Sequence, residues 1–125
     1  MIANALKVTG IDHVVLQVRD LEKSKRFYID LLGFTVGHES SWQSFLSCGS
    51  QQVALFQTRE GDEIHAGSAM NHMALRLASG EYDEVKAALE AAGVSVHGRR
   101  GDDHCIYFDD PDGHHLQLLT PAEQH

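Results

Sequence analysis

The sequence predicts an α+β fold made of two βαβββ modules related by a pseudo-twofold axis. The order strand, helix, glycine and three further strands occurs twice along the 125 residues, which indicates one structural unit used twice. Aligning the two copies sets His13 on His72 and Gly33 on Gly93. One such unit leaves a face of its sheet uncovered, so we expect the two units to pair within a single domain, residues 1–125.

The first module covers about residues 10–58. A strand is expected at residues 11–18, followed by a helix at residues 21–32 with Asp20 as its N-cap and Gly33 at its end. Apolar residues recur along that helix in a rough stripe, as a helix packed on a sheet requires. Three short strands complete the module, at 34–39, 44–48 and 52–58.

A polar, glycine-containing linker at residues 59–69 leads to the second module, which covers about residues 70–120. The same order of elements restarts there. A strand is expected at residues 70–77, and a helix at residues 81–92 that ends at Gly93. The remaining strands of this module are expected at 94–97, 105–109 and 114–120.

The last two strands flank the turn DPDG at residues 110–113, whose proline presets φ and whose glycine tolerates the exit conformation. In the final strand, alternation places His115, Gln117 and Leu119 on one face of the sheet. Gln117 therefore presents a polar side chain from an otherwise apolar strand. This predicts a site on that face.

Composition excludes some classes of partner. The net charge is −8, and ten Lys and Arg residues cannot assemble a basic face for nucleic acid or an anionic membrane. The sequence has no apolar run of membrane-spanning length and no basic-then-apolar leader, so we expect a cytoplasmic protein.

The repeat also pairs residues with metal-binding chemistry. If the first strands of the two modules lie side by side, His13 and His72 converge. Matching the ends of the final strands makes Leu55 the counterpart of Gln117. Only the two imidazoles and the amide of this cluster can bind a metal, and three protein ligands with open positions suit a catalytic ion. Taken singly, each histidine is as well explained as a hydrogen-bonded strand residue.

The chain resembles the vicinal oxygen chelate superfamily, which includes glyoxalase I, extradiol dioxygenases, fosfomycin-resistance enzymes and bleomycin-binding proteins. Three stretches within residues 11–120 carry the resemblance: IDHVVLQVRDLEKSKRFYIDLLGF, NHMALRL and YFDDPDGHHLQLL. The resemblance implies a glyoxalase-like curved mixed sheet around a central cavity, a divalent ion and a small-molecule substrate with vicinal oxygens. It also implies a homodimer, because the cavity of superfamily members is often completed across two subunits.

One position departs from the family pattern. The pattern places metal ligands at His13 and His72, and usually a glutamate where this chain has Gln117. An amide oxygen is an acceptable ligand without charge, so we expect weaker metal binding, by about a few kcal/mol. The imidazoles favour Mn, Fe, Ni or Zn. Alternatively, the site has lost its ion and binds only organic ligands.

The remaining candidates have both functional and structural interpretations. Tyr107 lies on the strand opposite Gln117 and is either a catalytic proton donor or a packed aromatic. Arg76 either contacts an anionic substrate or forms a surface ion pair of little energetic value. We expect the substrate-binding part of the site to include Leu55, Arg76 and His115. Three aromatic residues either wall a cavity or fill the core, and we expect the core: Trp42, Phe45 and Phe56.

Two main functions follow. The first is a metal-dependent enzyme of the lyase, isomerase or extradiol dioxygenase type, with the ion on His13, His72 and Gln117. The second is a metal-free protein that binds or sequesters a small molecule, as bleomycin-resistance proteins do. A third possibility is a scaffold for protein association.

Overall fold

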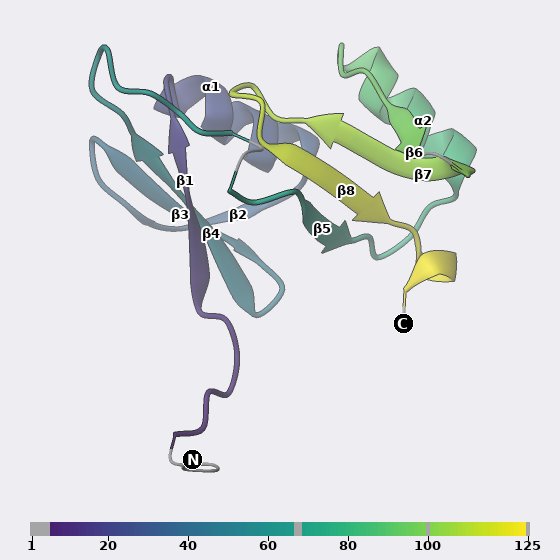
Figure 1. The fold of residues 1–125 in the computed structure, drawn as a ribbon, viewed down its shortest axis with the longest axis horizontal. Coiled ribbons are helices and arrows are strands. Elements are labelled where there is room, and N and C mark those ends of the chain that lie inside the picture. The colour runs from purple at the N-terminus through teal and green to yellow at the C-terminus, as the bar shows by residue number, and fades with distance from the viewer. Residues whose placement is uncertain (1–5, 67–68, 100, 125) are drawn as a thin grey trace.

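The computed structural model describes residues 6–66, 69–99 and 101–124. Residues 1–5 of the predicted domain and residues 67–68 of the predicted linker lie outside the described residues. The α+β prediction is confirmed: each module folds into one four-stranded mixed sheet with helical segments beside it, as Figure 1 shows.

In the first module, the predicted helix begins as an α-helix and continues as π-helical turns. Asp20 caps it as expected, because its carboxylate accepts the Lys23 N–H at 3.1 Å. Gly33 ends the helical stretch with a φ of 81°. The elements of this module are β1 (His13–Val18), α1 (Leu21–Arg26), η1 (Phe27–Leu31), β2 (Thr35–Glu39), β3 (Gln43–Cys48) and β4 (Gln51–Gln57).

The second module repeats this order, and Gly93 ends its helix with a φ of 83°. Its third-last strand begins later than predicted, at His97 rather than Val94, because Val94 and Val96 pack against the core before the pairing with the next strand starts. The elements are β5 (Met73–Arg76), α2 (Tyr82–Ala91), β6 (His97–Arg99), β7 (Asp102–Asp109), β8 (His115–Leu119) and the 3₁₀ turn η2 (Pro121–Glu123).

The two sheets have the same topology. Their strand orders are β1-β4-β3-β2 and β5-β8-β7-β6. In each sheet the first strand runs parallel to its neighbour, and the other pairs are antiparallel. In the described chain β1 and β5 do not pair with each other, so the sheets stay separate and each keeps one free edge beside its first strand.

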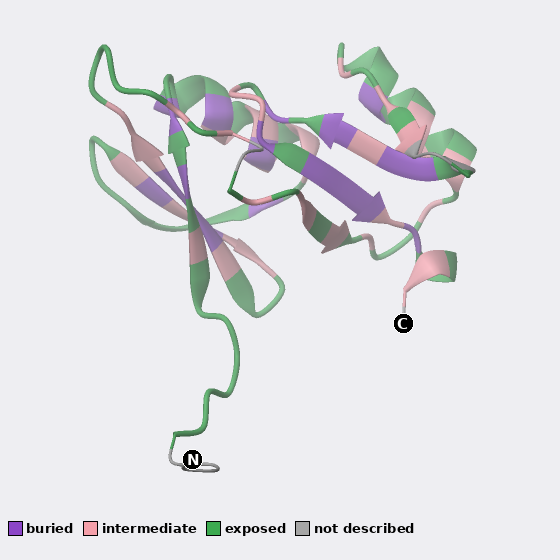
Figure 2. Cartoon of the chain, in the orientation of Figure 1, coloured by how far each residue is buried: buried purple, intermediate pink, exposed green. Residues whose placement is uncertain are grey.

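Alternation gives each sheet one buried and one open face. In β1, Leu16 and Val18 are buried while His13, Val15 and Gln17 are exposed. Figure 2 shows the buried residues concentrated on the central strands, with β7 and β8 the most continuous. The histidine-bearing faces are therefore open to a ligand, and the opposite faces form the core with the helices.

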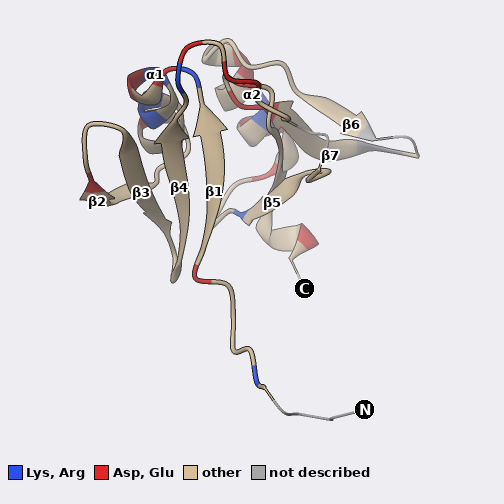
Figure 3. Ribbon diagram, turned by 60° about the vertical axis from the view of Figure 1, so that its left-hand side comes forward, with Lys and Arg blue, Asp and Glu red and all other residues tan. Residues whose placement is uncertain are grey.

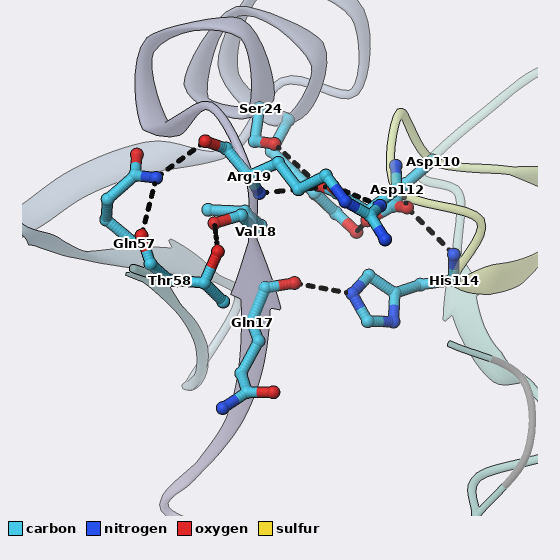
Figure 4. A network of polar contacts seen from close by, with 10 residues as sticks. Gln17, Val18, Arg19, Ser24, Gln57, Thr58, Asp110, Asp112 and His114 are labelled. Carbon is cyan, nitrogen blue, oxygen red and sulfur yellow. Dashed lines mark hydrogen bonds and ion pairs between the residues drawn. The ribbon is translucent and has the colours of Figure 1, made fainter. Parts of the chain in front are cut away.

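A group of polar contacts joins the modules, and we call it the latch (Figure 4). It links Asp110, Asp112 and His114 of the second module to the first module. The buried Tyr28 hydroxyl donates to Asp110 Oδ2 at 2.7 Å. Arg19 donates through its main-chain N–H and its guanidinium to Asp112 Oδ1, at 3.1 and 3.3 Å. His114 Nε2 lies 2.8 Å from the carbonyl oxygen of Gln17. The latch thus fixes the β7–β8 turn against η1 and the end of β1.

Charged residues lie mainly on helices and loops, as Figure 3 shows. The strands β1, β3 and β4 contain none. Within the part of the chain that the structure describes, no helix is both long and apolar enough to cross a membrane.

Candidate functional site

His13 and His72 are held in the same way, each by the residue that precedes it. His13 Nδ1 lies 2.7 Å from Asp12 Oδ1, and His72 Nδ1 lies 2.7 Å from Asn71 Oδ1. A carboxylate or amide oxygen accepts, so the neutral form of each imidazole that fits this contact carries its proton on Nδ1 and its lone pair on Nε2. Histidines that bind metals are typically oriented through the other ring nitrogen in this manner.

On the second sheet, His72, Tyr107 and Gln117 come together. The His72 and Tyr107 rings meet edge to face, with centroids 5.4 Å apart. Tyr107 pairs with Gln117 across β7 and β8, and Gln117 pairs with Ala74 on β5. Because β8 lies between β5 and β7, the two rings meet over the strand face that carries Gln117. This explains why Gln117 is only 7% exposed.

The Gln117 amide is available to a ligand. Among the described residues it has no hydrogen-bond partner, and none of its polar atoms is sealed from solvent. An amide so nearly buried normally satisfies its donors and acceptor within the protein. Gln117 therefore lies on a largely covered strand face and not in open solvent, while its place in a ligand site and its contact with a metal stay predictions.

On the first sheet, His13 stands beside an aromatic wall. Its ring contacts Phe45 edge to face at 5.2 Å, and Phe45 in turn lies 6.0 Å from Phe56. Trp42 meets Phe56 at 5.2 Å and is 51% exposed. The expectation that these aromatics fill the core was wrong. Register puts Phe45 and Phe56 on the open face, beside Val15 and Gln17 of β1.

The structure corrects the position of Leu55. This side chain is fully buried and pairs with Leu16, so it points into the core and not toward His13. Val15 is the counterpart of Ala74 when the two histidines are matched, and Val15 pairs with Ala54. The counterpart of Gln117 is therefore Ala54, whose methyl group cannot bind a metal.

Arg76 and His115 both lie on the face that carries Gln117. Arg76 is exposed at the end of β5. His115 Nδ1 lies 2.6 Å from Asp109 Oδ1, which orients the ring and leaves Nε2 free. Both are placed where a substrate on this face would meet them, and their contact with a substrate stays a prediction.

Sequence reasoning missed His97. Its ring stacks on Tyr107, with centroids 6.0 Å apart and the planes 22° from parallel. The residue pairs with Tyr107 across β6 and β7. Its place at the end of a predicted strand gave no hint of that register, because the strand begins only at this residue.

The two halves of the predicted metal site lie on separate sheets. His13 is on the first, and His72 and Gln117 are on the second, which does not pair with it. Among the described residues, no three His, Cys, Asp or Glu side chains gather closely enough to hold a metal. Within one described chain, the three predicted ligands are thus divided between two sheets that do not pair, and their assembly around a metal stays a prediction.

Comparison with known proteins agrees with this architecture. The sequence model of the family described as Glyoxalase/Bleomycin resistance protein/Dioxygenase superfamily matches residues 10–118. The glutathione transferase FosA of Serratia marcescens is 32% identical over 87% of this chain and 79% of its own length. The metallothiol transferase FosB of Staphylococcus saprophyticus is 31% identical over 94% of this chain and 80% of its own.

A solved structure shows the same fold with an ion. The fosfomycin resistance protein FosX from Listeria monocytogenes, complexed with Mn(II) and sulfate, superimposes with a TM-score of 0.75 at 25% identity, and the match covers 91% of each chain.

Proposed function

Because the chain belongs to the glyoxalase/bleomycin resistance protein/dioxygenase superfamily, we propose that it is a divalent-metal-dependent enzyme acting on a small substrate with neighbouring oxygen atoms. Lyase, isomerase and extradiol dioxygenase reactions all suit such a site. The names of the relatives, glutathione transferase and metallothiol transferase, favour a fourth type, the addition of a thiol to the substrate. Fosfomycin is the first substrate to test, because relatives are named for resistance to it.

The observation that carries this proposal is the matched anchoring of the two imidazoles. His13 and His72 both leave Nε2 free, and Gln117 offers an amide oxygen without a partner among the described residues. These donors fit a first-row divalent ion such as Mn, Fe, Ni or Zn. When bound, the ion supplies a Lewis acid for the oxygens of the substrate. The neutral donor set favours a substrate that itself brings negative charge.

The other residues on the open faces of the two sheets would bind and orient the substrate. The Tyr107 hydroxyl, next to both His72 and the strand position of Gln117, is placed to donate or accept a proton from the substrate. Arg76 supplies a positive charge at the end of β5 for an anionic group. The aromatic wall around Phe45 keeps water from one side of the site.

We further propose that the active form is a homodimer in which each site takes His13 from one copy and His72 with Gln117 from the other. The half-sites lie on different sheets of one chain, and both sheets have a free edge beside the relevant histidine. Two free edges that do not pair within the described chain would each be satisfied by a second copy.

A heterodimer tests this directly. Copies carrying His13→Ala and His72→Ala are given different tags, coexpressed and purified as the mixed dimer. The mixed dimer should bind Mn²⁺ at about one site, and either mutant homodimer at none, because only the mixed dimer holds one complete set of donors. Metal-dependent loss of fosfomycin in the presence of a thiol is the activity measurement. A wild type that binds Mn²⁺ while the mixed dimer does not would contradict the shared site.

The second candidate is a metal-free binding protein, and the neutral Gln117 favours it. The same open face, with its aromatic wall, would then hold an organic ligand without an ion. Wild-type protein that binds no Mn²⁺ under chelator-free conditions, yet binds a small molecule on this face, would support this function over the enzyme.

A further inference from the structure

The segment before β1 is joined to the described chain at its last residue, where the Asp12 carbonyl accepts the Gln52 N–H at 3.3 Å, whereas residues 6–11 have no hydrogen-bond partner among the described residues. We call residues 6–12 the arm; all seven are exposed, and Leu6 and Val8 each expose 88% of their surface. Figures 1 and 3 both show the arm running away from the two sheets. Apolar side chains at alternate positions of an extended segment are typical of a strand with one buried face, and this segment buries neither.

We propose that the arm is a β-strand that pairs with the free edge of β5 in a second copy of this chain, with Leu6 and Val8 filling the cleft beside it. The register of this pairing rests on the shared site proposed above, which brings His13 opposite His72 of the partner subunit. Three features of the structure support the pairing: which part of the β1 edge is open, which backbone groups point outward, and where the cleft lies.

The open part of the β1 edge is its start. Val18 accepts the Thr58 N–H at 2.9 Å, so its carbonyl faces β4, and Gln17 faces the free edge. There, His114 Nε2 lies 2.8 Å from the Gln17 carbonyl, and the latch covers this end of the strand. A new strand can therefore pair with this edge only along the first residues of β1 and the arm.

Backbone directions agree with the proposed register. Leu77 donates its N–H to the Leu119 carbonyl at 2.9 Å, so Ala74 and Arg76 direct their backbone groups to the free edge of β5. In β1 the Asp12 carbonyl accepts the Gln52 N–H, so the odd-numbered residues face outward.

β1 and β5 are the equivalent first strands of the two modules, and two equivalent strands that meet edge to edge about a local pseudo-twofold axis run antiparallel. With His13 opposite His72 of the partner subunit, Ile11 falls opposite Ala74 of the partner subunit and Thr9 opposite Arg76 of the partner subunit. All of these residues point their N–H and C=O groups toward the new strand, so they form hydrogen-bonded pairs. A shift by one residue would turn the donors and acceptors of the arm away from the edge.

Side-chain directions lead to the cleft. Leu6 and Val8 share the strand face opposite to His13, and Leu75 and Leu77 share the corresponding face of β5. Beside these two leucines the structure has a cleft of about 1040 Å³. Its apolar walls come from β5, α2 and β8 on one side and from the end of η1 on the other; they include Leu31, Leu32, Val85, Leu89 and Leu118.

The cleft is the counterpart of the latch. In the second module the β7–β8 turn reaches η1 through Asp110 and the residue after β1 through Asp112. The matching β3–β4 turn of the first module, around Gly49 and Ser50, has no acidic side chain and stands at the rim of the cleft. The space that the latch fills on one side is thus left open on the other, where an apolar strand fits.

Cross-linking tests the register. In a Cys48→Ser background, Val8→Cys with Leu77→Cys places two thiols at a pair without mutual hydrogen bonds, where Cα atoms about 4.5 Å apart suit a disulfide. We expect a covalent dimer under mild oxidation. The matched control, Lys7→Cys with Leu77→Cys, places the thiols on opposite faces and should stay unlinked. A disulfide within one chain, or no disulfide in folded protein, would overturn the proposal.

Sedimentation velocity gives a second test. Leu6→Ser with Val8→Ser should raise the dimer dissociation constant at least about a hundredfold, because two apolar side chains per copy return to water. Lys7→Ser should leave it unchanged. A dimer that binds Mn²⁺ and is indifferent to the double substitution would refute the arm pairing while the proposed function stands. A dimer that depends on the arm but binds no Mn²⁺ would refute the metal enzyme alone.

Discussion

The substitution Gln117→Glu tests the candidate site, because both the direction and the magnitude of its effects on stability and on Mn²⁺ affinity can be predicted. The change keeps the shape of the side chain and adds one negative charge at a position that is 7% exposed. Without an ion, burial disfavours the carboxylate, so the variant should unfold at lower urea concentration than the wild type in the presence of EDTA. With Mn²⁺ the order should reverse, because the ion stabilises only the folded protein.

The size of the effect follows from the charge and its burial. A pair of unit charges about 4 Å apart in a partly screened site contributes about 4 kcal/mol, and desolvation of the carboxylate offsets part of that. We expect a net gain of about 1.5–4 kcal/mol, which is about 10- to 1000-fold in the Mn²⁺ dissociation constant. Isothermal titration calorimetry in chelator-free buffer measures it.

A matched control removes the effect of net charge. Gln51→Glu adds the same charge at an exposed residue at the start of β4, and should change Mn²⁺ affinity by less than about threefold because such charges are screened. If both variants bind Mn²⁺ equally, or if Gln117→Glu is less stable than wild type with and without the ion, the placement of Gln117 at the metal is wrong.

Two further predictions concern the latch and the core. Burial raises the pKa of Asp110 above its ordinary value, with hydrogen bonds from Tyr28 and the His114 N–H partly opposing; a raised folded-state pKa means stability is lost as pH rises through it. In urea denaturation, the unfolding free energy of the wild type should therefore fall relative to that of Asp110→Asn as the pH rises from about 4. A difference in unfolding free energy that stays constant between pH 3 and 7 would contradict this. Leu55→Ala should cost about 2–5 kcal/mol in unfolding free energy, with unchanged Mn²⁺ affinity of the folded protein; an altered affinity would return Leu55 to the site.

The sequence was sufficient for those parts of the site that depend on period-two alternation within one strand. The placement of Gln117 and His115 on one face of β8, and of Tyr107 opposite Gln117, needed only that period and the turn before it. Such local geometry is set by the backbone itself. The Asp20 cap of α1 has the same character, because its hydrogen bond spans three residues.

The errors came from register between strands. Leu55 was aligned through the ends of the final strands, and one residue of slip turned it from the open face to the core. Phe45 was assigned to the core because apolar side chains are usually buried, whereas its pairing with Ala54 puts it beside His13. His97 was missed for a related reason, since only the β6–β7 pairing brings it to Tyr107. Pairing partners are set by tertiary packing, which one sequence does not display.

Ala54 and Gln117 occupy equivalent positions in the two modules, and this difference affects how many ligands the proposed site can offer. A perfect repeat would place a donor at both positions, and with His13 and His72 it would offer four protein ligands, the closed set of a structural ion. In this chain only the second module contributes a donor beyond its histidine. The methyl group of Ala54, which is fully buried, occupies the place where a fourth ligand would stand. In the proposed metal site, the divergence of the two modules at this one position would leave three protein ligands and open coordination positions for a substrate.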